Sequence, residues 1–153
     1  MVTTNSREIS ARRASLRLSD RQKKILIGSL LGDGCLIVNS GGIGYRLQVE
    51  QNEAHKGYVF WLYEELKEWV ISEPKYHPTV RSWKFRTISH PQLTDLAHEF
   101  YTRRVKIIPQ RIGELISDPL TLAVWAMDDG CLTKDRGFTL NTQSFTKREN
   151  ERL

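Results

Sequence analysis

At 153 residues, the chain has the length of one ordinary domain. Hydrophobic residues make up 39% and charged residues 27%. This composition can form a hydrophobic core, so it excludes intrinsic disorder of the kind that follows from too few apolar residues. The sequence has no apolar run of about 18 residues, so it predicts no membrane-spanning helix. It also has no apolar signal-peptide segment near its start. Cys35 and Cys131 stand far apart, which excludes a disulfide framework and a paired-cysteine zinc site.

The net charge of +5 and the isoelectric point near 9.4 favour a polyanionic partner. The excess lies in residues 1–24, where seven cations stand against Glu8 and Asp20: Arg7, Arg12, Arg13, Arg17, Arg21, Lys23 and Lys24. Residues 1–18 are therefore interpreted as a flexible basic arm. A solubilising tail would have the same composition, so charge alone does not decide the function.

The elements that follow form one predicted unit over residues 19–111. Ser19 and Gln22 have capping-box spacing and begin a helix that runs apolar to Leu31. Strands are predicted at 35–39 and 45–51, joined by the turn residues 39–42. A long helix at 53–70, a strand pair within 76–88 and a helix at 91–104 complete an α-β-β-α-β-β-α order.

A second unit repeats this pattern over residues 118–153. Asp118 and Pro119 are typical of a helix start. The four residues Asp-Gly-Cys-Leu occur at 33–36 and again at 129–132, which is 96 positions later (129 minus 33). Thr146 and Glu149 open the counterpart of the long helix, again with capping-box spacing. By comparison with the first unit, about 48 residues are expected to be missing from the second, which indicates a fragment or split half.

The two nine-residue segments 26–34 and 122–130, with the lead-in Lys106-Ile107-Ile108-Pro109, resemble the signature of the LAGLIDADG homing endonucleases. The version with Met-Asp-Asp-Gly in the second copy is similar to single-chain, two-motif members. The resemblance implies an α+β fold of two pseudo-symmetric αββαββα units, saddle-shaped around central motif helices, with the second unit incomplete. It also implies Mg²⁺-dependent hydrolysis of both strands of a long double-stranded DNA site.

The candidate catalytic carboxylates are Asp33 and Asp129, which would meet where two closely packed helices end. Small residues suited to such a crossing are Gly28, Gly32, Ala123 and Ala126. Two carboxylates at helix C-termini oppose the helix dipoles and repel each other, so a hard divalent cation between them is favoured. The candidate metal site comprises Asp33 and Asp129 with the preceding residues Gly32 and Asp128. Asp128 is expected to cap the helix or orient a neighbour. Mg²⁺ is the expected ion, with Mn²⁺ as the alternative.

Lys106 is the third candidate catalytic residue, because the resembling family places a lysine there that reaches the active site. The candidate DNA-binding residues alternate along two strands, a pattern that gives a polar face over an apolar core: Arg46, Gln48, Glu50, Lys84 and Arg86. Arginine and glutamine pair bidentately with purine edges in the major groove. The tryptophans at helical core spacing and the four histidines are interpreted as structural.

Two other interpretations stay open. The protein could be a maturase that assists the splicing of intron RNA, as some relatives of the resembling family do. It could instead be an inactive or split fragment that needs a partner chain for its C-terminal part, or a homodimer of the first unit. A cytoplasmic, nucleoid-associated location is expected, with an organellar one as the alternative.

Overall fold

The computed structural model describes residues 7–42 and 44–153. The first unit contains the elements α1 (Arg7–Ser15), α2 (Asp20–Leu31), β1 (Cys35–Val38), β2 (Tyr45–Asn52), α3 (Lys56–Glu65), β3 (Lys75–His77), β4 (Ser82–Arg86) and α4 (Pro91–Phe100). The rest comprises β5 (Tyr101–Thr102), β6 (Val105–Lys106), α5 (Ile112–Leu115), α6 (Pro119–Asp129), β7 (Gly130–Leu132), β8 (Phe138–Leu140) and α7 (Lys147–Asn150). The predicted order of elements is therefore present in the first unit.

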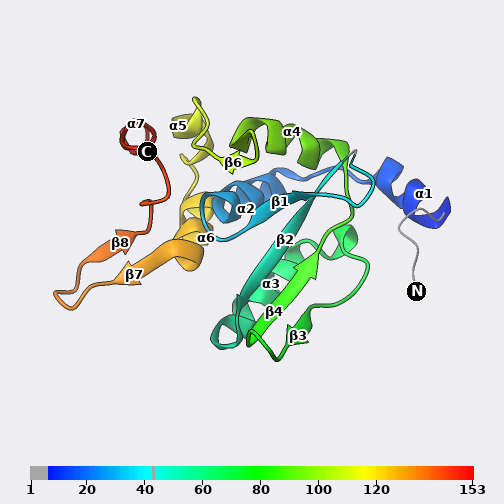
Figure 1. The fold of residues 1–153 in the computed structure, drawn as a ribbon, viewed down its shortest axis with the longest axis horizontal. Coiled ribbons are helices and arrows are strands. Elements are labelled where there is room, and N and C mark those ends of the chain that lie inside the picture. Colours follow the sequence, from blue (N-terminus) through cyan, green and yellow to red (C-terminus); the bar gives the residue numbers. More distant parts are fainter. Residues whose placement is uncertain (1–6, 43) are drawn as a thin grey trace.

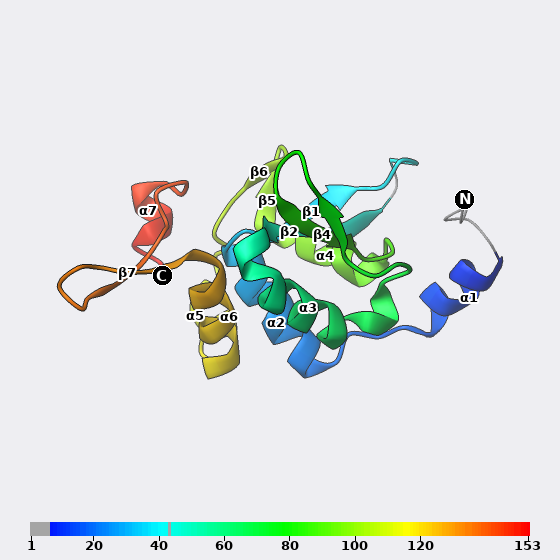
Figure 2. The ribbon, with the colours of Figure 1, turned by 90° about the horizontal axis from the view of Figure 1, so that it is seen from below.

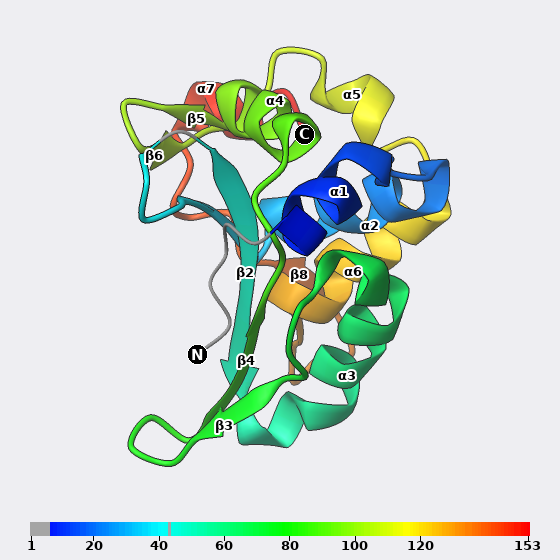
Figure 3. The ribbon, with the colours of Figure 1, turned by 90° about the vertical axis from the view of Figure 1, so that its right-hand side faces the viewer.

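An antiparallel sheet in the order β1-β2-β4-β3 forms one layer, and the helices lie on the other side of the core (Figures 1 and 3). Burial alternates along β2: Leu47 and Val49 face the core, while Arg46 and Gln48 face outward. This alternation follows from the two-residue period of a strand. The helices therefore cover only the apolar face of the sheet and leave its polar face open.

Both motif helices begin where the sequence predicts. The Ser19 hydroxyl accepts a hydrogen bond from the Gln22 backbone N–H, and the Gln22 side-chain oxygen accepts one from the Ser19 N–H. This capping box satisfies backbone groups that the first turn of a helix leaves unpaired. At the start of α6 the Asp118 carboxylate accepts from the Leu120 N–H, and Pro119 occupies the first turn.

Helices α2 and α6 pack side by side, and two glycines in or just after α2 face their own repeat equivalents in α6 (Figures 1 and 2). A Cβ placed on Gly28 would lie 2.8 Å from the Val124 Cβ, and one on Gly32 would lie 2.3 Å from the Asp128 Cβ. Each pair is 96 residues apart in the sequence, so the contacts lie along a pseudo-two-fold axis. Gly28 and Gly32 lie at the crossing as predicted. Ala123 does not, because it is exposed on the side of α6 near Tyr58 and Trp61 of α3.

Two helices are shorter than predicted. The helix expected at 53–70 is α3 alone, flanked by the 3₁₀ turns Glu53–His55 and Lys67–Trp69. The helix expected at 91–104 ends at Phe100, and the chain then reverses through the hairpin β5–β6. The turn of this hairpin holds Arg103 and Arg104 at positive φ angles of 50° and 67°. Apolar periodicity did not reveal this reversal, which brings Lys106 back toward the end of α2.

The prediction of a flexible basic arm is wrong for residues 7–18, while residues 1–6 lie outside the described residues. Residues 7–15 form α1, and the side chains of Ile9, Leu16 and Leu18 are buried. The Arg12 guanidinium donates hydrogen bonds to the carbonyl oxygens of Glu68 at 2.7 Å and Lys67 at 3.2 Å. Apolar burial and these two bonds hold the segment against the body of the protein.

The second unit is less enclosed than the first. Its hairpin β7–β8 projects away from the helices, and its apolar side chains Leu132 and Phe138 are 79% and 54% exposed (Figures 1 and 2). The corresponding strands of the first unit are part of the four-stranded sheet and bury Leu36 and Leu47. Among the described residues, no helix is long and apolar enough to cross a membrane.

Candidate functional site

The two candidate carboxylates come from the two repeats and belong to one electrostatic site. Asp33 follows the C-terminus of α2, and Asp129 is the last residue of α6. Partial burial raises the pKa of Asp129, and the charge of Asp33 raises it further, while Lys106 lowers it. The helix crossing has thus brought two acids with a repulsive interaction to one end of the helix pair, as the repeat predicts.

Lys106 lies close to this pair. Its Nζ donates hydrogen bonds to the carbonyl oxygens of Gly32 at 2.7 Å and Gly34 at 2.8 Å, on either side of Asp33. Burial lowers the pKa of Lys106, and the neighbouring acids, Asp129 among them, oppose that shift. The side chain therefore fixes the turn that carries Asp33 and sets a cation beside both carboxylates.

Gln51 is a site residue that sequence reasoning missed. Its Nε2 donates to Asp33 Oδ2 at 2.9 Å and to Asp128 Oδ1 at 3.2 Å, so one amide connects acids from the two repeats. Gln51 is only 9% exposed and shares the inward face of β2 with Leu47 and Val49. A polar side chain at the end of an apolar strand face was the signal that could have identified it, because buried amides take hydrogen-bond partners.

Asp128 lies between the two helices and faces away from solvent. Burial is the main cause that raises the pKa of Asp128, to about 7; the hydroxyls of Tyr58 and Ser29 lower it, and the charge of Asp33 raises it. Its Cβ occupies the space that a side chain at Gly32 would need. Asp128 therefore orients Gln51 and packs at the crossing, in line with the expectation that it orients a neighbour.

The donor set at the helix ends suits a hard divalent cation. The carboxylates of Asp33 and Asp129 supply oxygen ligands, and a cation between them would relieve their repulsion. The Gly32 carbonyl already accepts from Lys106, and one Asp128 oxygen accepts from Gln51. Among residues 7–42 and 44–153, no cluster of three or more His, Cys, Asp or Glu side chains could hold a metal ion. Two carboxylates are therefore the protein ligands that this site offers most directly.

The five candidate DNA-binding residues all lie on the outward face of the sheet. Gln48 pairs in register with Arg86, and Glu50 pairs with Lys84. The Arg86 Nε donates to Gln48 Oε1 at 2.8 Å, and the Lys84 Nζ donates to Glu50 Oε2 at 2.6 Å. The hydrogen bond with Lys84 lowers the pKa of Glu50. These pairs fix the long side chains in place on an open face, with Arg46 beside them.

The residues interpreted as structural are divided between the interior and the surface, since His55, His77 and His98 are exposed. Trp69 and Trp125 are 1% and 4% exposed, and Trp61 is partly buried. His90 is buried and caps α4, since its Nδ1 accepts from the Gln92 N–H at 3.1 Å. These side chains support the fold that positions the acids.

Comparison with known proteins agrees with this geometry. The family model described as the LAGLIDADG DNA endonuclease family matches residues 23–153. DNA endonuclease I-ChuI of Chlamydomonas applanata is 30% identical, over 86% of this chain and 69% of its own length. Cytochrome b mRNA maturase bI2 of Debaryomyces hansenii is 28% identical, over 89% of this chain and 55% of its own length. The structure of the homing endonuclease I-WcaI bound to its DNA recognition sequence superimposes with a TM-score of 0.86, at 28% identity, over 99% of this chain and 73% of that chain.

Two crossed motif helices that end in paired aspartates, beside an antiparallel sheet, define the fold of a LAGLIDADG endonuclease. The chain belongs to the LAGLIDADG DNA endonuclease family. The predicted family and fold class are therefore confirmed. The chain spans about half the length of the Debaryomyces maturase, so it corresponds to a part of that relative.

Proposed function

We propose that this chain is a homing endonuclease that hydrolyses phosphodiester bonds in both strands of a long duplex site, with Mg²⁺ as its metal and Mn²⁺ as the alternative. One observation carries the proposal: Asp33 and Asp129, from repeats 96 residues apart, interact electrostatically at the ends of two crossed helices. The structure of the similar protein I-WcaI is bound to its DNA recognition sequence, which supports duplex DNA as the partner.

In this proposal Asp33 and Asp129 hold the metal ion. A divalent ion bound there supplies positive charge that stabilises the attacking and leaving oxygens of a phosphoryl displacement. Gln51 keeps the Asp33 carboxylate oriented through the 2.9 Å hydrogen bond. Lys106 holds the turn around Asp33 and adds a fixed cation next to the charge that develops on the phosphate.

The outward face of the sheet would lie against the DNA. Arg46, Gln48 and Arg86 carry the donors and acceptors that match purine edges in the major groove. Lys84 forms an ion pair with Glu50, so part of its charge is neutralised and it should attract DNA phosphates less strongly than an unpaired lysine would. The amide–guanidinium pair between Gln48 and Arg86 presents both groups in a fixed geometry.

The test is Mg²⁺-dependent cleavage of a plasmid library that carries random long sites. Linear product is expected from the wild type and from Asp20→Asn, which removes an exposed carboxylate at the other end of α2. It is expected to disappear in Asp33→Asn and Asp129→Asn, while both variants still bind duplex DNA. Cleavage that survives in both of these variants would contradict the proposal.

A role in RNA splicing is the second candidate function, and the similarity to cytochrome b mRNA maturases favours it. Intron RNA would then be a further partner. Splicing assays with Asp33→Asn would separate the two roles, because a maturase need not use the metal-binding carboxylates. A relative described as chloroplastic supports the organellar location as the alternative to a cytoplasmic, nucleoid-associated one.

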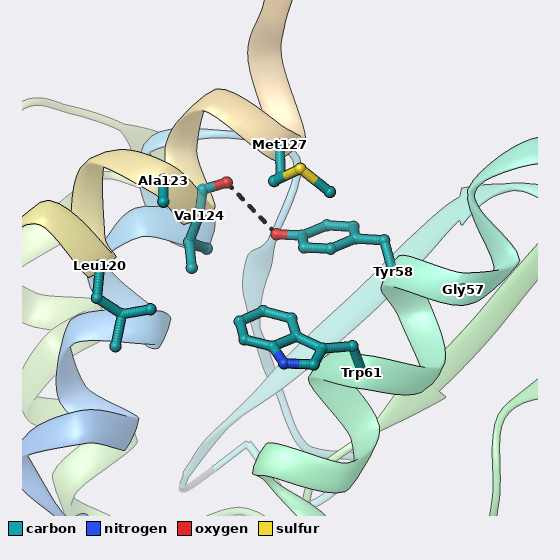
Figure 4. Close-up of a pocket in the computed structure, with 7 residues that line it drawn as sticks. All are labelled: Gly57, Tyr58, Trp61, Leu120, Ala123, Val124 and Met127. Atoms are coloured by element: carbon teal, nitrogen blue, oxygen red, sulfur yellow. Dashed lines mark hydrogen bonds between the residues drawn. The ribbon is translucent and has the colours of Figure 1, made fainter.

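The requirement for a further polypeptide is a separate proposal, and the open apolar surface of the second unit supports it. A pocket of about 370 Å³ lies between α3 and α6, where Trp61, Leu120 and Met127 surround the contact of Tyr58 with α6 (Figure 4). The Tyr58 hydroxyl donates to the Val124 carbonyl oxygen at 3.4 Å. Met127 is 55% exposed. Addition of a polypeptide corresponding to the rest of the second unit is expected to raise cleavage activity, and an unchanged rate would contradict this requirement.

A further inference from the structure

A groove of about 1030 Å³ lies at one end of the sheet, where α1, the β1–β2 turn, β4 and the start of α4 converge. Four cationic side chains line it, one each from α1, β2, β3 and β4: Arg13, Arg46, Lys75 and Arg86. Asp95 is the one acid that lines it among the described residues. The lining therefore carries a formal charge of +3 (four minus one), although the chain after residue 24 is formally neutral.

Two of these cations have donor atoms that lack acceptors. Within the described part of the chain, the Nε atoms of Arg13 and Arg46 are enclosed and have no hydrogen-bond partner. An enclosed donor without an acceptor costs about 1–3 kcal/mol. Burial lowers the pKa of Arg46, and the neighbouring charge of Arg86 lowers it further. An anion in the groove would relieve the repulsion between the Arg46 and Arg86 guanidinium groups.

The position of Arg13 is fixed by the docking of α1. Arg12, its neighbour, is bonded to the carbonyls of Glu68 and Lys67. The backbone carbonyl oxygen of Arg13 lies 3.1 Å from His90 Nε2, at the start of α4. The N-terminal basic segment therefore forms part of the groove in the folded chain, and its contacts hold the Arg13 side chain at the groove wall.

We propose that this groove, the α1 groove, binds the phosphodiester backbone of duplex DNA, with Arg13 as the contact that α1 adds. Arginine matches phosphate oxygens with its planar fork of donors. The groove shares Arg46 and Arg86 with the outward face of the sheet, so a duplex lying on that face would extend into it. The inference rests on the proposed function, and it assigns to α1 a contact with the DNA backbone that carries no sequence information.

The experiment is fluorescence anisotropy with a labelled 40-base-pair duplex of arbitrary sequence in EDTA, at several salt concentrations. Arg13→Gln is compared with Arg17→Gln, which removes the same charge four residues away. The Arg17 guanidinium donates to the carbonyls of Ala14 and Leu16. One lost phosphate contact should reduce the slope of log K against log salt by about 0.9, and weaken binding on the order of eightfold at 0.1 M salt. Arg17→Gln should retain the wild-type slope, and so should the charge-preserving Arg13→Lys.

Equal slopes for Arg13→Gln and Arg17→Gln would overturn the proposal that the α1 groove binds the DNA backbone, and would leave the proposed function intact. Weaker binding of a structured RNA by Arg13→Gln, with duplex binding unchanged, would also overturn it. A wild type that binds no duplex at all would overturn both proposals. Thermal melting of each variant accompanies the titrations. If Arg13→Gln fails to fold, Arg13→Ser and Arg13→Lys make the same comparison, and equal slopes for these two would overturn the groove.

Discussion

Replacement of Gly28 by alanine should destabilise the protein, because the crossing of α2 and α6 has no room for a methyl group. A Cβ at this position would lie 2.5 Å from the Thr121 carbonyl oxygen and 2.8 Å from the Val124 Cβ. Ordinary contact begins at 3.4 Å, so the helices must separate by nearly 1 Å at this point. Both atoms belong to the opposite helix close to its backbone, and neither can swing aside as the end of a long side chain could.

The magnitude follows from two opposing effects. Alanine is about 1 kcal/mol better than glycine inside a helix. Overpacking of a tight core costs typically 1–3 kcal/mol, and a gap of 0.5–1 Å forfeits a quarter to a half of each dispersion contact along the seam. Thr121 and Val124, which the added methyl group would meet, are 0% and 1% exposed, so the second effect should win. We expect a net loss of about 1–2 kcal/mol in the free energy of unfolding.

The matched control is Gly57→Ala in α3, where a Cβ would have no heavy atom within 4 Å. It should be neutral or stabilising by up to about 1 kcal/mol, since only helix propensity acts there. Urea denaturation measures both variants against the wild type. If Gly28→Ala were as stable as Gly57→Ala, the close approach of the motif helices would be refuted.

Three further predictions concern the site. Because burial raises the pKa of Asp128 to about 7, the folded state holds this proton more tightly than the unfolded chain, so stability should fall as pH rises from about 4 through 7. Asp128→Asn should flatten that fall in metal-free urea titrations, and an unaltered pH profile would rule out this explanation. Gln51→Leu should lower the free energy of unfolding by about 1–3 kcal/mol in urea denaturation, because it leaves the Asp128 carboxyl group without its amide donor. The control Gln48→Leu on the open face should lower it by less than about 0.5 kcal/mol. Similar losses in the two variants would argue against the bridging amide. Lys106→Met should reduce the single-turnover cleavage rate by about 100-fold or more while the far-UV spectrum stays native, and a rate within tenfold of wild type would exclude a catalytic contribution.

The sequence alone determined the features that rest on local signals. The capping residues Ser19 and Asp118 predict both helix starts, and the repeated Asp-Gly-Cys-Leu predicts two equivalent helix ends. The two-residue alternation in 45–51 and 80–88 predicts which side chains share the outer face of the sheet. The caps and the alternation depend on residues only a few positions apart, and the repeat is visible when the sequence is compared with itself, so none of these signals requires a tertiary contact.

Only the tertiary structure decided the features that join distant segments. The bridge from Gln51 to Asp33 and Asp128 needs a strand of one repeat and a helix of the other to meet. Arg12 docks on backbone carbonyl oxygens, and Arg13 lines a groove. Both the carbonyls and the groove come from residues about 30 to 80 positions further along the chain. Helical periodicity gives a helix its faces and does not say which one meets a neighbour, which is why Ala123 was expected at the crossing and lies outside it. The basic composition of the N-terminal segment carried no sign of its partners, because packing against the body, and not charge, determines whether such a segment folds.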